Sequence, residues 1–359
     1  MDLLDGHVMY QCHTDSFIHC FCSTSKYFII AESLIEQPTK VVLFYIRKDD
    51  PTNCTIIAND IGISINRDTA PHVRIVKGML IAGTGTIHLV VNTSDGILVY
   101  PFGSTRGNIK NNESCKWTLP NVQDTIESMD IDEDADDHTD LVLVTKLGHV
   151  YCVRYESVNN RISTLQRYKN LDNVATDCIN SVKCSQGEIA LASFDNFVYA
   201  WIDRKLESQH ISHIPMDTSV DHTVTSVDFV KIKKYSSSFL RFYAVNVTNI
   251  GCILYKRSLR GQWEMAQVLA RDEASAEEVT PLVQCTIHHG TGSNDLTIMS
   301  GSESGKLYIW KYRYASDEIT FESQLSAASS GVIHNIVMSD ASTINYLMND
   351  DTCIATLCI

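Results

Sequence analysis

The stretch that decides the fold is Ser300–Trp310, "SGSESGKLYIW", because its glycines and lysine can be interpreted in three ways. A phosphate-binding P-loop requires a glycine five residues before the Gly-Lys pair and a Ser or Thr after the lysine, but Ser300 and Leu307 stand there. A nucleophile elbow requires serine at the centre of G-x-S-x-G, where the chain has Glu303. The following "KLYIW" has the β-branched and aromatic residues that strands favour. The stretch therefore predicts a turn between two strands.

Similar strand-turn-strand segments recur along the chain. Each has an anchor residue directly before a short apolar strand, and the spacing of successive anchors ranges from 47 residues (Gly305 to Thr352) to 56 residues (Lys40 to Gly96). The seven anchors are Lys40, Gly96, Gly148, Asn196, Gly251, Gly305 and Thr352. Self-similarity at such a period is typical of repeat architectures, and seven units cover the chain.

Each unit is predicted to hold four short strands. Around Gly148 these are "TIESMDI", "LVLVTK", "HVYCVRY" and "ISTLQRY", separated by polar breaks, and helical periodicity is nearly absent from the chain. Four strands repeated about every 50 residues predict an all-β fold, a single seven-bladed β-propeller of four-stranded antiparallel blades. We expect one domain over 1–359, with blades at about 14–62, 70–122, 123–170, 176–216, 221–270, 279–326 and 330–359 plus 6–13.

The two ends of the chain are predicted to share the last blade. The seventh unit supplies only "GVIHNIVMS", "TINYLMN" and "CIATLCI", whereas a surplus strand, "HVMYQCH", precedes the first unit. A ring of sheets leaves its first and last blades unlocked unless the termini pair. We therefore expect His7 to Cys12 to form the outer strand of the seventh blade.

These repeats resemble the WD-repeat family of propellers over essentially the whole chain. "SGSESGKLYIW" matches that family's turn and third strand, and "DHTVTSVDFV" at 221–230 matches its histidine-led entry into an inner strand. The resemblance implies that an aspartate in the turn between the second and third strands bonds such a histidine. The matching positions are Asp95, Asp195 and Asp351 for the aspartate, and His222 and His13 for the histidine. The Trp-Asp ending is missing, since Lys311 follows Trp310, so the repeats are degenerate, and a different seven-bladed lineage is the alternative.

Composition limits the class of protein. The net charge of -14 argues against the broad basic surface that duplex nucleic acid requires. The twelve cysteines form no C-x-x-C pair and mostly lie in apolar segments, which predicts reduced core thiols and hence the nucleus or cytoplasm. No apolar run approaches the roughly 20 residues of a membrane helix, and acids replace the basic start of a signal peptide. We expect a protein that is neither secreted nor membrane-embedded.

No catalytic or metal-binding constellation emerges from the candidate residues. His288 and His289, with His7, His13 and His19 as candidate metal partners, lack the spacing that places two ligands on one element. The acidic run Met129–Asp140 alternates like a Ca²⁺ loop, but Ala135 stands where that loop needs glycine and Leu141 where it needs glutamate. We therefore expect no enzyme activity, no cofactor and no small-molecule substrate.

Charged loops are the candidate partner-binding sites, with mere solubilisation as the alternative. On one face, the Met129–Asp140 run and the segments Lys231–Arg241 and "KRSLRGQ" predict an acidic patch on blade three and a basic patch on blade five. On the other face, "RDEASAEEV" at 271–279 could form a short helix, and "SLIEQP" enlarges a second loop. The candidate residues are Asp130, Asp132, Glu133, Asp134, Asp136, Asp137, Lys231, Lys233, Lys234, Lys256, Arg257, Arg260, Glu273, Glu277 and Glu278.

The resemblance to WD-repeat propellers implies a non-catalytic scaffold that binds other protein subunits of a larger complex, such as a nuclear pore, chromatin, RNA-processing or ubiquitin-ligase assembly. Two alternatives stay open. One is an RNA-contacting propeller that uses the basic patch of blade five, whose binding would fall steeply with salt. The other is an enzyme with a site in the central channel, which needs converging polar side chains that the sequence does not show.

Overall fold

The structure is a computed structural model of the chain. It describes residues 7–12, 14–23, 27–37, 40–62, 75–80, 86–93, 96–103, 115–121, 123–132, 138–156, 159, 161–167, 179–185, 187–193, 197–202, 205–210, 223–235, 238–248, 250–269, 281–290, 294–326, 332–340, 343–348 and 353–358. These residues form strands β1 to β28 and no helix. A helix of the length and apolarity needed to span a membrane is therefore absent from them.

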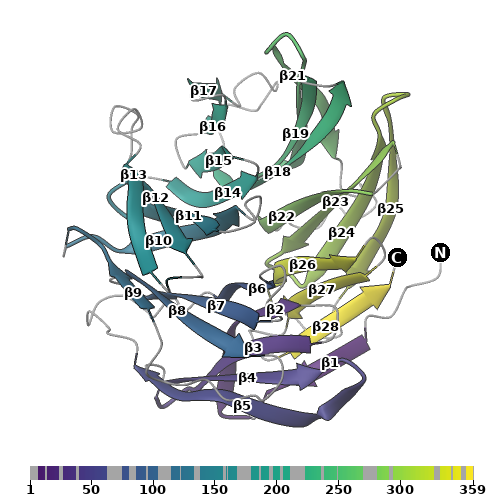
Figure 1. Cartoon of the computed structure of the whole chain (residues 1–359). Helices are drawn as coiled ribbons and strands as arrows, with labels where there is room; N and C mark the ends of the chain where they lie inside the picture. The colour runs from purple at the N-terminus through teal and green to yellow at the C-terminus, as the bar shows by residue number, and fades with distance from the viewer. Residues whose placement is uncertain are drawn as a thin grey trace. The chain divides into compact units, whose positions relative to one another are not determined.

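The chain divides into two compact units, and each is described by itself. One unit consists of Val8–Asp177 with Asp351–Ile354, and the other of Cys178–Asp350 with Met1–His7 and Ala355–Ile359. The described strands form four-stranded sheets, numbered here in chain order (Figure 1). In the first six sheets, strands that follow one another along the chain are hydrogen-bonded neighbours.

The unit based on Val8–Asp177 contains the first three sheets, whose strands pair antiparallel. The first sheet is β2 (Ser16–Ser23), β3 (Tyr27–Leu34), β4 (Lys40–Arg47) and β5 (Asp50–Gly62). The second is β6 (Ile75–Leu80), β7 (Thr86–Thr93), β8 (Gly96–Gly103) and β9 (Cys115–Thr118). The third is β10 (Ile126–Asp132), β11 (His138–Thr145), β12 (Val150–Glu156) and β13 (Arg161–Arg167).

The unit based on Cys178–Asp350 contains three further antiparallel sheets. The fourth sheet is β14 (Ile179–Ser185), β15 (Glu188–Ser193), β16 (Phe197–Ile202) and β17 (Lys205–His210). The fifth is β18 (Val224–Tyr235), β19 (Ser238–Val247), β20 (Gly251–Arg257) and β21 (Trp263–Leu269). The sixth is β22 (Leu282–His289), β23 (Asp295–Ser302), β24 (Lys306–Arg313) and β25 (Glu318–Ser326).

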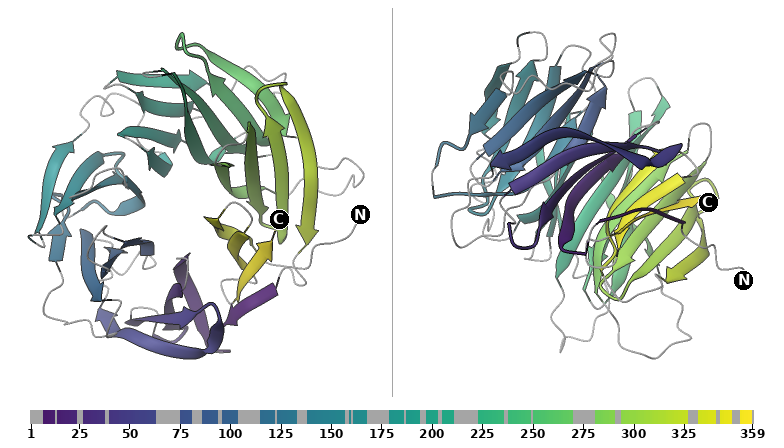
Figure 2. Two further views of the ribbon diagram at one scale, coloured as in Figure 1. Left: turned by 45° about the vertical axis from the view of Figure 1, so that its right-hand side comes forward. Right: turned by 90° about the horizontal axis from the view of Figure 1, so that it is seen from below.

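The seventh sheet joins the two ends of the chain. Its order is β1 (His7–Gln11), β28 (Cys353–Cys358), β27 (Thr343–Met348) and β26 (His334–Asp340), so the first strand completes the last sheet, as Figure 1 and Figure 2 show. Tyr10 of β1 donates a hydrogen bond to Oε2 of the buried Glu32 at 2.6 Å and packs on Phe44. The predicted pairing of the termini is confirmed.

Buried cores form on both sides of the fifth sheet. Tyr243, Val245 and Ile253 of the fifth sheet pack with Ala192 and Val198 of the fourth in one apolar cluster. Their neighbours of opposite parity, such as Phe242 and Leu254, pack against the sixth sheet in a second cluster. This strict alternation gives each central strand two apolar faces, which explains why the strands read as nearly continuous hydrophobic runs.

Polar side chains also join the fifth and sixth sheets. Oδ2 of Asp228 accepts hydrogen bonds from the Thr286 hydroxyl at 2.8 Å and from the Ile287 N–H at 3.1 Å. Oγ of Ser226 accepts a hydrogen bond from the Cys285 N–H at 2.9 Å. Because buried hydrogen bonds are costly to break, these contacts hold the two sheets in one register.

The glycines of the opening stretch have two different functions. Gly305 has a φ of 75° in the turn between β23 and β24, as the turn prediction requires. Gly301 lies within β23, so its predicted place in the turn is wrong. A Cβ on Gly301 would lie 2.1 Å from the carbonyl oxygen of Ile333, whose N–H bonds the Ser302 carbonyl at 3.0 Å. Gly301 therefore permits a close backbone approach between the sixth sheet and the segment that leads into β26.

Two predicted charged loops are largely strand. β18 runs to Tyr235 and β19 begins at Ser238, which places most of Lys231–Arg241 inside a hairpin. β10 runs to Asp132 and β11 begins at His138, so both ends of the predicted loop Met129–Asp140 also belong to strands. Period-two alternation explains the difference, because Ile232 and Ile131 are buried on one face of their strands while their charged neighbours lie on the opposite face.

The third sheet carries an aspartate–histidine pair that the sequence did not reveal. Nδ1 of His149, in the turn between β11 and β12, lies 3.0 Å from Oδ2 of the buried Asp124, which precedes β10. Oδ1 of Asp124 accepts from the N–H groups of Thr125 and Leu147 at 3.0 and 3.1 Å. The positions of acid and base are exchanged relative to those expected from WD repeats. The expected positions themselves, Asp95, Asp195, Asp351, His13 and His222, lie outside the described residues.

Among the cysteines whose side chains the structure describes, the free thiols are Cys12, Cys54, Cys115, Cys152, Cys184, Cys252 and Cys285. Cys152, Cys184, Cys252 and Cys285 are buried, as predicted for core residues. Cys54 on β5 is exposed, so the expectation of core thiols does not extend to it.

Candidate partner-binding site

Three cationic side chains lie in one row across the fifth sheet. The register places Lys231 of β18 opposite Arg241 of β19, and Arg241 opposite Arg257 of β20. Directly opposed residues share a face of a sheet. Here it is the face toward the fourth sheet, because Tyr243 and Tyr255, the next residues of the same parity, lie in the core that the two sheets share. Like charges directly opposite one another destabilise a sheet, so this row requires anions beside it.

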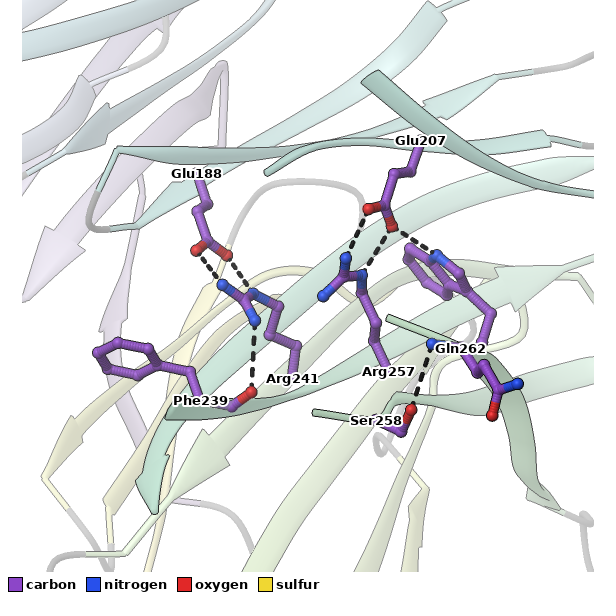
Figure 3. A network of polar contacts seen from close by, with 8 residues as sticks. Glu188, Glu207, Phe239, Arg241, Arg257, Ser258 and Gln262 are labelled. Carbon is purple, nitrogen blue, oxygen red and sulfur yellow. Dashed lines mark hydrogen bonds and ion pairs between the residues drawn. The ribbon is translucent and has the colours of Figure 1, made fainter. Parts of the chain in front are cut away.

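Glu188, at the start of β15, compensates two of these cations. Its Oε2 accepts a hydrogen bond from Nε of Arg241 at 2.6 Å, and its Oε1 accepts from Nη2 at 2.5 Å (Figure 3). Nζ of Lys231 lies 2.9 Å from the same Oε1. Only 4% of the Glu188 side chain is exposed. Burial raises the pKa of Glu188, but the hydrogen bonds and charges of Arg241 and Lys231 outweigh it and hold the pKa below its ordinary value. The Glu188 carboxylate is therefore ionised at neutral pH.

Glu207 of β17 holds the third cation. Its Oε2 accepts from Nε of Arg257 at 2.7 Å and from the indole Nε1 of Trp263 at 3.0 Å, and its Oε1 accepts from Nη2 of Arg257 at 2.5 Å (Figure 3). Burial raises the pKa of Glu207, yet the hydrogen bonds from Arg257 and Trp263 leave it below its ordinary value. The hydrogen bonds that Arg257 donates to Glu207 in turn raise the pKa of Arg257.

A hollow of about 320 Å³ opens beside this row, and we name it the basic hollow. Its lining includes Lys231, Arg241, Arg257 and Arg260, together with Phe239 and Gly261. Nζ of Lys231 lies 4.5 Å from the centroid of the Phe239 ring, a cation–π contact. Four cations face the hollow, whereas the row is compensated by two carboxylates. An excess of positive charge is therefore fixed in a chain whose net charge is -14.

Arg260 stands in the turn between β20 and β21. Gly261 has a φ of 81° there, and a Cβ on it would lie 3.2 Å from Nη2 of Arg257. The turn is closed by hydrogen bonds from the Ser258 N–H to the Gln262 carbonyl at 2.8 Å, from the Gly261 N–H to the Ser258 carbonyl at 2.9 Å, and from the Gln262 N–H to Oγ of Ser258 at 3.2 Å. The glycine leaves room for the Arg257 guanidinium, and the turn holds Arg260 beside it.

The structure brings together only part of the predicted basic patch. Lys231, Arg257 and Arg260 line the hollow, and the exposed Lys233 lies one step further along the same face of β18. Lys256 has the opposite parity and stands across from Glu264 of β21. The side chain of Lys234 is outside the described part of the structure.

The sequence did not indicate Glu188 and Glu207, and it placed Phe239 and Arg241 within the basic segment Lys231–Arg241 without marking them as candidates. Arg241 is a lone cation inside the apolar segment "FLRFY", and Glu188 opens the apolar strand "EIALAS". A charge inside an apolar strand is the signal that could have identified them, because such residues are rarely buried without a partner.

The predicted acidic sites are described only in part. Asp130 and Asp132 lie on β10, and Asp132 stands opposite Asp140 of β11. Arg154 donates from Nε and Nη2 to the two carboxylate oxygens of Asp140 at 2.8 and 2.9 Å. The residues outside the described segments are Glu133, Asp134, Asp136, Asp137, Glu273, Glu277 and Glu278, as is the predicted helix at 271–279.

The two candidate catalytic histidines lie near the end of β22. His288 is half-buried, and burial, followed by the neighbouring His289, lowers its pKa. Nε2 of His289 lies 3.4 Å from the Tyr314 hydroxyl. His7 begins β1, whereas His13 and the side chain of His19 are outside the described residues.

Comparisons with known proteins identify the fold. No family model matches the chain, and no curated protein matches it in sequence. Solved structures do match over 99% of its length: BBS1N in complex with ARL6DN (11% identity, 96% of that chain, TM-score 0.58), U3-55K (10%, 98%, 0.62) and the WD40 repeats of RRP9 (9%, 97%, 0.62). With seven four-stranded sheets and termini that share the last one, the chain has the fold of the WD40-repeat β-propellers.

Proposed function

We propose that this protein is a non-catalytic interaction scaffold, a subunit that holds protein partners in a larger assembly. The observation that carries the proposal is the basic hollow, where buried ion pairs with the fourth sheet fix a row of cations and leave positive charge in excess. Recognition sites of this kind combine a rigid framework with charges that steer a complementary partner. Among the similar structures, BBS1N was solved in complex with ARL6DN, which supports the same use of the fold here.

We further propose that the protein resides in the nucleus or cytoplasm. There it would belong to an assembly such as a nuclear pore, chromatin or RNA-processing complex. An RNA-contacting function is the second candidate, because cations of the fifth sheet gather at one place. The protein function is favoured since two of those cations are neutralised in bidentate pairs, and the chain as a whole is strongly acidic.

The test is purification of the tagged full-length chain from its own cells at near-physiological salt, followed by quantitative mass spectrometry. We expect partner proteins in stoichiometric amounts that remain after nuclease treatment. A solitary monomer in the extract would contradict the scaffold function, and loss of all partners on nuclease treatment would favour the RNA function.

A further inference from the structure

The donors of the basic hollow are only partly used by the protein itself. Arg241 and Arg257 each present Nε and Nη2 to a glutamate, and Nη1 of Arg241 donates to the Phe239 carbonyl. Within the described part of the chain, no group accepts a hydrogen bond from Nη1 of Arg257 or from any nitrogen of Arg260. Arginine donors at a hollow are the groups that proteins use to bind oxyanions, because a guanidinium presents several N–H groups in one plane.

These free donors are held in place in the unliganded chain. Arg257 is fixed by its bidentate pair with Glu207, and its side chain is only 12% exposed. Arg260 is carried on the turn closed by Ser258, Gly261 and Gln262. A site whose donors are already fixed loses little conformational entropy on binding, so this geometry favours a ligand more than scattered surface lysines would.

The size and wall of the hollow indicate the class of ligand. A volume of about 320 Å³ lies at the small end of ligand pockets, which suits a side chain and not a folded domain or a nucleic acid duplex. Phe239 supplies an apolar wall beside the cations. A polynucleotide would need a long track of cations, whereas the excess charge here is confined to one hollow on a chain of net charge -14.

We propose that the basic hollow binds an oxyanion-bearing side chain in an extended segment of a partner protein, with Arg260 and Nη1 of Arg257 as the donors. The oxyanion is the carboxylate of Asp or Glu, or the phosphate of a phosphorylated Ser or Thr, since both accept hydrogen bonds from guanidinium groups. The inference rests on the proposed scaffold function and adds the chemistry by which a partner is recognised. Lys231 and Arg241, which are held in place by their ion pairs with Glu188, complete the row of cations beside these donors.

The experiment measures binding of fluorescent peptides to the purified full-length chain by anisotropy. The probes are a Gly-Ser peptide with a central phosphoserine, its counterpart with two adjacent glutamates, its neutral counterpart with two glutamines, and a short oligouridine. The variant is Arg260→Glu, and the matched control is Arg161→Glu, an exposed arginine at the start of β13. Thermal unfolding of each variant verifies that it is folded.

We expect at least one anionic peptide to bind, binding to weaken with salt, and Arg260→Glu to weaken it about tenfold or more, since charge-assisted hydrogen bonds are lost. Arg161→Glu should leave binding unchanged. The preferred anionic peptide identifies the oxyanion as carboxylate or phosphate. Equal binding of the neutral peptide, tighter binding of oligouridine, no binding of any peptide, or no effect of Arg260→Glu overturns the inference. Co-purification of partners with Arg260→Glu in undiminished yield also overturns it but leaves the scaffold function standing.

Discussion

Glu188 is the side chain on which the arrangement of cations in the fifth sheet depends. It comes from the fourth sheet and accepts from both Arg241 and Lys231 while almost fully buried. A buried ion pair adds little net stability, but removal of one member leaves the other charge uncompensated. Glu188 therefore fixes the position of Arg241 more than it strengthens the fold.

The first prediction concerns the charge of Glu188. Glu188→Gln should lower the free energy of unfolding by about 3 kcal/mol, because Arg241 stays buried without a counter-ion. Urea denaturation of the full chain measures this loss. Glu318→Gln, at an exposed residue whose carboxylate lies 3.9 Å from Arg313, is the matched control and should change little. Equal stability of the two variants would mean that Glu188 does not neutralise the row.

The second prediction follows from the lowered pKa values of Glu188 and Glu207. The unfolded chain binds protons at these groups near the ordinary value of 4.5, whereas the folded chain resists protonation until lower pH. Their contribution to stability is therefore complete above that pH and declines as the pH falls below it. Unfolding midpoints measured from neutral to acid pH should show this decline, with a shallower slope in Glu188→Gln. Identical slopes would refute the assignment.

At the scale of elements, the contacts between successive sheets determine how closely the strands pack. At Gly301 the Ile333 carbonyl occupies the place that a side chain would take. Ser302 and Ile333 are joined there by a backbone hydrogen bond. The glycine therefore acts on the approach of two sheets and not on a turn.

The third prediction is that Gly301→Ala lowers the free energy of unfolding by about 1–3 kcal/mol, because the new methyl group must displace backbone. Chemical denaturation provides the measurement. Glu303→Ala, at an exposed position in the same hairpin, adds no atom to the contact and should leave stability nearly unchanged. The close approach would be disproved by a Gly301→Ala protein as stable as this control.

Short-range patterns predicted most of the elements but not the site. The turn at Gly305 and the strand that holds Trp310 could be predicted because alternation and turn chemistry act over a few residues. The basic hollow could not, since Glu188 and Arg241 are separated by 53 positions and Glu207 and Arg257 by 50. Which acid neutralises which base depends on the register of two different sheets, and composition does not encode that register. The pair of Asp124 and His149 was not predicted either, because the two residues lie 25 positions apart and the acid and the base have exchanged the positions that WD repeats give them.

At the scale of the whole molecule, the two ends of the chain meet in the seventh sheet. β1 lies beside β28 in that sheet, and Tyr10 of β1 bonds Glu32 of the first sheet. The pairing of β1 with β28 joins residues from opposite ends of the chain. Such non-local contacts form slowly, because the entropy of closing the long loop between them must be lost first. The N-terminal strand is thus part of the fold.

The fourth prediction is that a chain without residues 1–12 loses on the order of 5 °C or more in Tm, because β28 is left without its neighbouring strand and Glu32 without the hydrogen bond from Tyr10. Differential scanning calorimetry gives the value. A chain without residues 1–6, which retains β1, is the matched control. An unchanged Tm for the longer deletion would contradict the role of β1.

If the protein is a scaffold, its partners bind at the basic hollow. Crosslinking mass spectrometry of the native purified complex tests this location most directly. Lys233 is exposed on the same face of the fifth sheet as the hollow, whereas the exposed Lys116 and Lys146 belong to the second and third sheets. We expect amine crosslinks that join Lys233 to a partner protein. A chain that purifies alone, or partner crosslinks that involve Lys116 and Lys146 but never Lys233, would contradict it.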